Sequence, residues 1–521
     1  MHDQGVRTVR LAGSVLFTKV FTLILTGASF LVVARILGPA TYGVYTIAMA
    51  TAGVFGFLGD LGFSTTIIKF ISEHGQKDMA RRAKPVVINI FFIILAVEGF
   101  FTLIGILISP FVAQNIIHNT AYTSALMIAS LTILFGALWG VSYSAIVALR
   151  KSKMLAYASM LQITMQAVVS VGLALAGFGA IAPIIGFLAG LLAGFALAAS
   201  IIMRETGTGL AELRPTLSEI KRLTIFSLPL GLSGTALSLI ANFSLVFLGY
   251  YSTSVILGNY SVISRVGNFF DVFLASISLA LLPLFSATFN DASKVKDISK
   301  YYNYAIYFAL LFVIPALFYI IALAKQVSYT AFTGVYTYAP LYLVLMCVGI
   351  LISIPYLYST NLFVGAGKIR KVVKYNVAVA ALQLVLLPIL IPTLNGLGLT
   401  LITFIITPIA FNLLYARKLH QLYKIKLEIG VLSRLVGAGV VSALLIAPLR
   451  YFIGGSFIPV LVIAALEQLI IYPPLIAYMG GIDEGRIEVL RRITGNLPVV
   501  NAVIRLLTDY TSIFLRWPLR S

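Results

Sequence analysis

Charged residues are scarce in this 521-residue sequence, and hydrophobic residues are abundant. Asp, Glu, Lys and Arg together make up only 10% of the chain, whereas 60% is hydrophobic and the mean hydropathy is +1.02. A soluble domain has about 25% charged and about 45–50% apolar residues. A soluble core of this length could not bury so much apolar surface, so lipid must surround much of the chain. We therefore predict an all-α polytopic membrane protein.

Cysteine, histidine and tryptophan are also rare, and each shortage excludes a class of function. The single cysteine, Cys347, permits no intramolecular disulfide. The four histidines are scattered without metal-ligand spacing, so we predict no metal site and no cofactor. The net charge is +20, but two tryptophans and no basic–aromatic cluster leave nucleic acid without a binding platform. Membrane topology accounts for the charge instead.

Fourteen apolar segments are long enough to cross a bilayer, which takes about 20 residues. They are residues 11–33, 42–68, 85–109, 122–148, 155–176, 183–203, 223–249, 258–285, 301–324, 338–363, 375–392, 398–416, 434–453 and 458–479. With the N-terminus in the cytoplasm, nearly all of the 37 Lys and Arg residues lie on the cytoplasmic side. The exceptions are Arg35, Lys325 and Arg450 outside, and Lys19 and Arg265 within helices. This positive-inside bias predicts an even number of spans and two cytoplasmic termini.

A long cytoplasmic connection and a repeated motif divide the predicted helices into two lobes. Gly43-Val44-Tyr45 opens the second segment and Gly258-Asn259-Tyr260 opens the eighth, as in a parallel internal repeat. The predicted organisation is a six-helix N-lobe at 1–203, a cytoplasmic linker at 204–222, a six-helix C-lobe at 223–416, two further helices at 417–479 and a cytoplasmic amphipathic tail at 480–521. In the tail, Arg505 and Asp509 favour a helix at the membrane surface over a fifteenth span.

The first predicted helix carries a polar stripe. Lys19, Thr22, Thr26 and Ser29 recur at intervals of three, four and three residues, which places them on one face. Such a stripe either packs against other helices through hydrogen bonds or lines a wet cavity, and the lysine favours the cavity. Asp60 lies at a similar depth in the second helix, so an ion pair with Lys19 is expected. That pair could take part in ion coupling or simply fix the two helices together.

The eighth predicted helix carries a second stripe, flanked by a cation. Ser261, Ser264, Asn268, Asp271 and Ser278 share a face, and Arg265 lies beside it. The planar guanidinium of arginine can donate two parallel hydrogen bonds to a phosphate, whereas the ammonium group of lysine acts as a point charge. We therefore expect Arg265 and Asn268, together with Lys19, Thr22, Thr26 and Arg35, to bind an anionic substrate.

Three carboxylates lie at membrane depth in the first twelve predicted helices. Asp60 and Asp271 each have a possible partner nearby in the sequence, whereas Glu98 has none. Glu98 is therefore either a site for a coupling proton or sodium ion, or a buried carboxyl satisfied by a neighbour. We expect Glu98, Asp60 and Asp271 to be the candidates for ion coupling. Glu467-Gln468, in the fourteenth segment, remains without an assigned role.

The outer end of the first hairpin carries a family motif. Residues 34–45, Ala-Arg-Ile-Leu-Gly-Pro-Ala-Thr-Tyr-Gly-Val-Tyr, are followed by Gly59-Asp60-Leu61-Gly62 and then by Lys69 and Glu73. This pattern resembles the polysaccharide transporter family, which includes the O-antigen flippases and belongs to the multidrug/oligosaccharidyl-lipid/polysaccharide exporter (MOP) superfamily. Locally, Gly38-Pro39 and Gly43 also fit a tight outer hairpin.

The resemblance implies a plasma-membrane flippase that acts as a monomer. It would move a polyprenyl-(di)phosphate-linked oligosaccharide from the cytoplasmic to the outer leaflet by alternating access, with membrane lipids around it. The alternative is a multidrug or cation exporter of the same superfamily, but that branch favours acidic cavities and an acidic residue where this chain has Lys19. A membrane-embedded enzyme would need metal-binding aspartate pairs or a sizeable outer loop, and neither is visible, so we expect no enzymatic activity.

Overall fold

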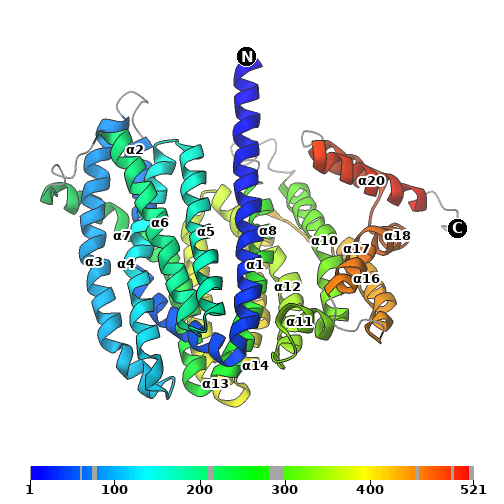
Figure 1. The fold of residues 1–521 in the computed structure, drawn as a ribbon. Helices are drawn as coiled ribbons and strands as arrows, with labels where there is room; N and C mark the ends of the chain where they lie inside the picture. The colour runs from blue at the N-terminus through cyan, green and yellow to red at the C-terminus, as the bar shows by residue number, and fades with distance from the viewer. Residues whose placement is uncertain are drawn as a thin grey trace. The chain divides into compact units, whose positions relative to one another are not determined.

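The computed structural model of the protein is helical throughout the residues that it describes. These residues are 2–58, 62–72, 79–207, 215–280, 298–451, 457–494 and 498–515, and no strand occurs among them. Ten helices in these ranges are long and apolar enough to cross a membrane, and Leu237–Tyr251 and Val462–Tyr478 are shorter apolar helices. The predicted all-α polytopic membrane fold is confirmed (Figure 1).

The chain forms two compact units, which we describe separately. Unit 1 comprises residues 1–261 and 380–399. Its elements are α1 (His2–Phe55), η1 (Gly56–Leu58), α2 (Phe63–Ser72), α3 (Met79–Asn115), η2 (Thr120–Tyr122), α4 (Thr123–Ala148), α5 (Ser152–Leu175), α6 (Ile181–Thr206), α7 (Leu217–Tyr251), the start of α8 (Ser254–Ala280), the end of α13 (Ile369–Leu394) and the start of α14 (Gly396–Leu401).

Unit 2 comprises residues 262–379 and 400–521. It holds the rest of α8, the start of α13 and the end of α14. Its other elements are α10 (Ile298–Ala322), α11 (Ala324–Phe332), α12 (Ala339–Gly365), η5 (Ile402–Ile406), α15 (Thr407–Tyr423), α16 (Ile429–Ile446), η6 (Ala447–Tyr451), α17 (Phe457–Leu466), η7 (Glu467–Ile471), α18 (Tyr472–Tyr478), α19 (Glu484–Thr494) and α20 (Pro498–Leu515).

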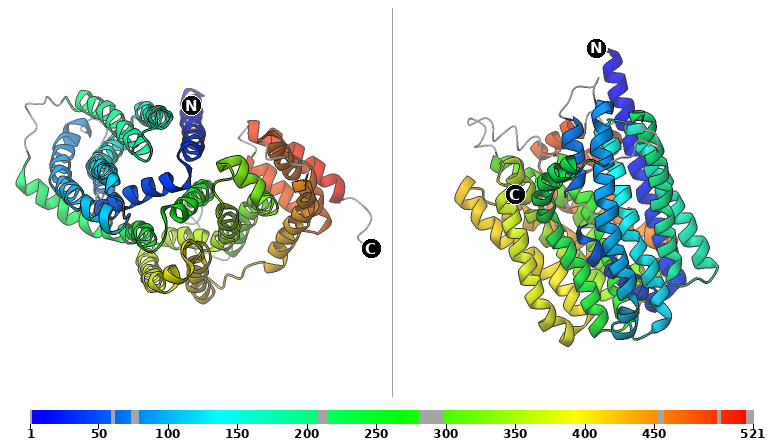
Figure 2. Two further views of the ribbon diagram at one scale, coloured as in Figure 1. Left: turned by 60° about the horizontal axis from the view of Figure 1, so that its bottom comes forward. Right: turned by 90° about the vertical axis from the view of Figure 1, so that its left-hand side faces the viewer.

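Helix α1 contains a sharp turn that separates the first two predicted spans. Gly38 has φ 67° and ψ 173°, and Pro39 follows it. A positive φ is readily adopted by glycine, and proline fits the first turn of the next helix. The two parts of α1 consequently run at a steep angle to one another (Figure 2). The turn that the Gly38-Pro39 pair predicts is therefore present.

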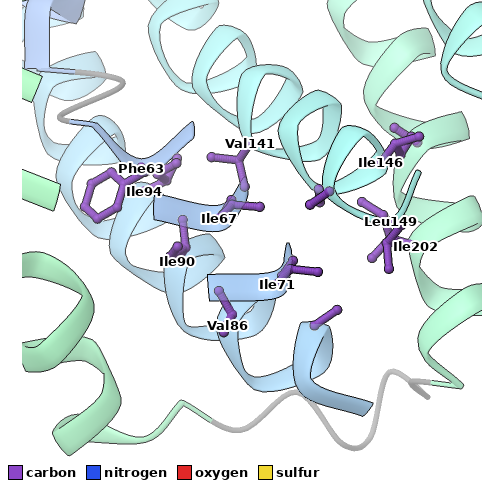
Figure 3. Packing of buried hydrophobic residues seen from close by; sticks show 14 of the residues in the cluster. Phe63, Ile67, Ile71, Val86, Ile90, Ile94, Val141, Ile146, Leu149 and Ile202 are labelled. Atoms are coloured by element: carbon purple, nitrogen blue, oxygen red, sulfur yellow. The ribbon is translucent and has the colours of Figure 1, made fainter. Parts of the chain in front are cut away.

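A buried apolar cluster holds α2 against its neighbours in unit 1. Phe63, Ile67 and Ile71 are spaced by four residues on α2 and are almost completely buried. They meet α3 at Val86 and Ile90, and the cluster continues onto α4 and α6 (Figure 3). In lipid such packing stabilises mainly through van der Waals contact, because the surrounding chains are equally apolar. The predicted span 42–68 thus includes α1 up to Phe55, the 3-10 turn η1 and the start of the separate helix α2.

Two π-helical turns, η5 and η7, interrupt predicted spans in unit 2. Such turns are rare and often occur at functional sites. Beyond the last span, α20 runs crosswise to α10 (Figure 1). Arg491 of α19 donates to the Thr508 hydroxyl at 2.9 Å and pairs with Asp509, which holds α19 and α20 together.

Candidate functional site

The polar residues predicted on α8 share an exposed face. Arg265, Asn268 and Asp271 are all exposed and lie three residues apart. The buried side of the helix packs differently: a Cβ on Gly267 would lie 3.3 Å from the Met346 sulfur and 3.4 Å from the Phe404 ring. The Gly267 position of α8 is therefore packed against α12 and the π-helical turn η5, whereas the side chains of Arg265, Asn268 and Asp271 are exposed.

Asp271 has an aromatic neighbour on α12. Its carboxylate interacts electrostatically with the Tyr356 phenol. The Tyr356 ring in turn stacks on Phe411 of α15, with ring centroids 4.8 Å apart and an interplanar angle of 18°. The acidic end of the α8 face is thus bordered by an aromatic pair, which the sequence did not reveal. Ser261, predicted on the same stripe, is buried and donates to the Leu257 carbonyl of its own helix at 2.7 Å.

The α1 stripe is only half-buried. Thr22, Thr26 and Ser29 all have intermediate exposure, and Ser29 donates to the Thr26 carbonyl at 3.1 Å. Arg35 is exposed, three residues before the Gly38 turn. These residues belong to unit 1. The structure therefore presents the predicted substrate-binding residues in two separately described parts, one on α1 and one on α8.

Two predicted residues cannot be placed. Asp60 and the side chain of Lys19 lie outside the described residues. Their ion pair stays a prediction, as does the role of either residue in binding or coupling.

Glu98 is buried on α3, with 1% of its surface exposed. Its Oε2 atom has no hydrogen-bond partner among the described residues. The same holds for the hydroxyl of Thr102, one turn further along the same face, and for that of Thr51 on α1. No described residue therefore donates a hydrogen bond to Oε2, although a buried carboxyl with a purely structural role would be expected to accept one.

Unit 1 contains a cavity of about 400 Å³ that the sequence did not predict. Residues of α1, η1, α2, α4 and α6 line it, and several of them are small. Its lining is Met49, Ala52, Gly53, Gly56, Ser64, Thr132, Ile133, Gly136, Ala137, Gly140, Val141 and Phe187. The Ser64 and Thr132 side chains are polar, and no acidic side chain occurs among these described lining residues. The spacing of Gly53/Gly56 and Gly136/Gly140 is the signal that could have indicated it.

The two copies of the predicted repeat motif meet within unit 1. A Cβ on Gly43 would overlap the carbonyl group of Ser254, with the carbonyl carbon at 2.8 Å. A Cβ on Gly258 would likewise overlap the carbonyl group of Pro39, with its carbon at 2.7 Å. Pro39 and Ser254 each precede the glycine of their own helix by four residues. The contact is therefore reciprocal, and the glycines do more than shape a hairpin.

Comparison with known proteins identifies the family. The profile of the family described as "polysaccharide biosynthesis protein" matches residues 32–339, more than half of the chain. The chain belongs to this family. The resemblance carried by the motif at residues 34–45 is thereby confirmed. No curated protein matches the sequence.

Solved structures show the same fold. The lipid II flippase MurJ in an inward closed conformation superimposes with a TM-score of 0.70 and 17% identity, covering 90% of this chain and 99% of MurJ. A multidrug resistance MATE family transporter in an inward-facing conformation gives 0.63 and 14%, with coverages of 78% and 95%. A MOP superfamily transporter from Pyrococcus furiosus gives 0.51 and 16%, with coverages of 79% and 94%. The protein therefore shares its fold with these three structures.

Proposed function

We propose that this membrane protein is a flippase for a polyprenyl-(di)phosphate-linked oligosaccharide. It would carry this substrate from the cytoplasmic to the outer leaflet of the plasma membrane by alternating access, as a monomer with both termini in the cytoplasm. It would perform no covalent chemistry. Membership of the polysaccharide biosynthesis family supports the class of substrate.

The exposed Arg265–Asn268 edge of α8 is the observation that carries the proposal. An arginine within a membrane span is costly unless it serves a polar partner or a wet cavity. Its guanidinium can donate two parallel hydrogen bonds to a phosphate, and the Asn268 amide can add another. A lipid-linked sugar presents such an anion, which this edge of α8 could bind.

The cavity of unit 1 is compatible with the same substrate class. Its volume lies in the usual range for sites that bind small molecules, about 300–1,000 Å³. Its described lining supplies hydroxyls from Ser64 and Thr132, which suit the hydroxyl groups of a sugar.

Transport of two different compounds, measured in parallel, tests the proposal. The purified protein is reconstituted into vesicles with a fluorescent polyprenyl-diphosphate oligosaccharide in both leaflets, and exchange between leaflets is followed by quenching from outside. Parallel vesicles are loaded with a cationic dye, and its efflux is measured. We expect rapid exchange of the lipid-linked sugar and no dye efflux above that of protein-free vesicles. Dye efflux without sugar exchange would favour the exporter.

A further inference from the structure

Glu467 is a fully buried carboxyl in the last predicted span. It opens the π-helical turn η7, near the middle of the helical stretch formed by α17, η7 and α18. None of its surface is exposed. The proposed transport function does not use this residue, because it lies in the two helices beyond the internal repeat.

The carboxyl group is bound on one side only. Its Oε1 atom accepts a hydrogen bond from the Ser442 hydroxyl of α16, and Ser442 is itself fully buried. Its Oε2 atom has no hydrogen-bond partner in the described parts of the chain. The next residue, Gln468, donates to the Phe312 carbonyl of α10 at 3.3 Å. The π-helical turn thus presents one polar side chain to α16 and the next to α10.

Apolar side chains surround this contact. Ile463, Ala464 and Ile471 lie within one turn of Glu467, and they pack with Tyr319 of α10 and Ile446 of α16. Ile463, Ala464 and Ile471 lie three or four residues from Glu467, so they are on the same face of the helix as Glu467. The carboxyl therefore lies beside an apolar cluster and has no exposed surface.

Among the described residues, no positively charged group is recorded as interacting with Glu467. Helix α11, which packs on α17, carries Lys325, and that side chain is exposed. The phenols of Tyr319 on α10 and Tyr472 on α18 interact electrostatically with it, and both are neutral. Helix α17 has no titratable residue. The single titratable residue of α16 is Arg434, eight residues before Ser442 and hence about 12 Å away along the helix. Arg434 donates instead to the Gly480 carbonyl at 3.1 Å. The Tyr510 hydroxyl of α20 donates a hydrogen bond to the Ile470 carbonyl and not to the Glu467 carboxyl.

We propose that Glu467 is a proton-binding site, with Ser442 as its hydrogen-bond donor. The step is simple protonation: the carboxylate takes up one proton to give the neutral acid, and no other reactant is needed. A metal ion fits less well, because it needs several oxygen ligands and the described residues offer one carboxyl and one hydroxyl bonded to it. Loss of the proton would place an uncompensated charge where α16 meets η7, so proton occupancy holds these two elements together.

Infrared spectroscopy tests this site without any transport substrate, and so independently of the proposed function. The purified protein is examined at neutral pH in an ester-free detergent, where the carbonyl stretch of protonated carboxyls is visible. Glu467→Gln should remove one component of that band, since glutamine keeps the shape but binds no proton. Ser442→Ala should shift the same component to higher frequency, because one hydrogen bond is lost.

Glu98→Gln is the matched control, because Glu98 is another buried carboxyl in a span but lies in unit 1. It should leave the component assigned to Glu467 unchanged. If Glu467→Gln fails to fold, the shift in Ser442→Ala decides. Loss of signal from the ionised-carboxylate band in Glu467→Gln would overturn the proposal, as would an unshifted band in Ser442→Ala. If the band component assigned to protonated Glu467 is replaced by a carboxylate band when Na⁺ replaces K⁺ in the buffer, the proposal is also overturned. Glu467 would then bind a cation.

Discussion

Gly43 and Gly258 each occupy a position where a side chain would overlap the backbone of the other's helix. They are the glycines of the repeated Gly-x-Tyr motif, and each contacts the residue four positions before the other. Reciprocal contact of equivalent residues is what two related repeats produce when they cross about a pseudo-two-fold axis. The two glycines of the motif therefore have a packing role.

This crossing should tolerate no added methyl group. We expect Gly43→Ala or Gly258→Ala to lower the free energy of unfolding by about 1–3 kcal/mol, the usual cost of overpacking. Thermal unfolding in detergent, followed by tryptophan fluorescence or by a thiol dye on Cys347, measures the effect. Gly172→Ala on α5 is the control: no atom lies within 4 Å of the added Cβ, so stability should be unchanged or slightly higher. Equal stability of all three variants would contradict the close contact.

The topology can be tested with single cysteines, since Cys347 is the only native thiol. In a Cys347→Ser background, cysteines at Lys153 and Ser218 should react with a membrane-impermeant reagent only from the cytoplasmic side. Cysteines at Asn119 and Ser252 should react only from outside. The positive-inside distribution of Lys and Arg is the physical reason. Labelling of Asn119 and Lys153 variants from the same side would exclude the predicted arrangement.

Proton coupling is predicted to depend on Glu98 more than on Asp271. Glu98 is buried and its Oε2 atom has no partner in the described residues, whereas Asp271 is exposed beside Tyr356. Glu98→Gln removes a titrating group and should flatten the pH dependence of flipping, measured in vesicles across a pH gradient with the membrane potential clamped. Asp271→Asn should change it less. An unchanged pH profile in Glu98→Gln would leave Glu98 a structural carboxyl.

The cavity of unit 1 offers a test of its own. Gly140 lines it, and a Cβ there would have no atom within 4 Å, so the fold should accept a larger side chain. We expect Gly140→Leu to slow flipping several-fold while the melting temperature stays within a few degrees of the wild type. Gly172→Leu, on a helix that does not line the cavity, is the control. Unimpaired flipping by Gly140→Leu would show that the substrate does not use this space.

Much of this fold follows from local patterns in the sequence. Helical periodicity alone places Asn268 and Asp271 on one face with Arg265 beside it, and Gly38-Pro39 predicts the turn in α1. The lack of a charged partner for Glu98 could also be predicted, because no charged residue lies near it in the sequence. The Asp271–Tyr356 contact could not be predicted, since it depends on two helices far apart in the chain. The glycine spacing hinted at the cavity, but its lining comes from several separate helices. The π-helical turns lack a local sequence signature, because they arise from packing.

Flipping by variants of Arg265 tests the central claim most directly. Wild-type protein, Arg265→Ala and Arg265→Lys are reconstituted at equal amounts, and appearance of the lipid-linked oligosaccharide in the outer leaflet is timed. Arg204→Ala, an exposed arginine in the last turn of α6, is the control. A charge-assisted hydrogen bond contributes about 1.5–3 kcal/mol, so Arg265→Ala should slow flipping by roughly 10- to 100-fold. Lysine should restore it only in part, because the bidentate geometry is lost. Wild-type rates in Arg265→Ala would contradict the phosphate-binding role of α8.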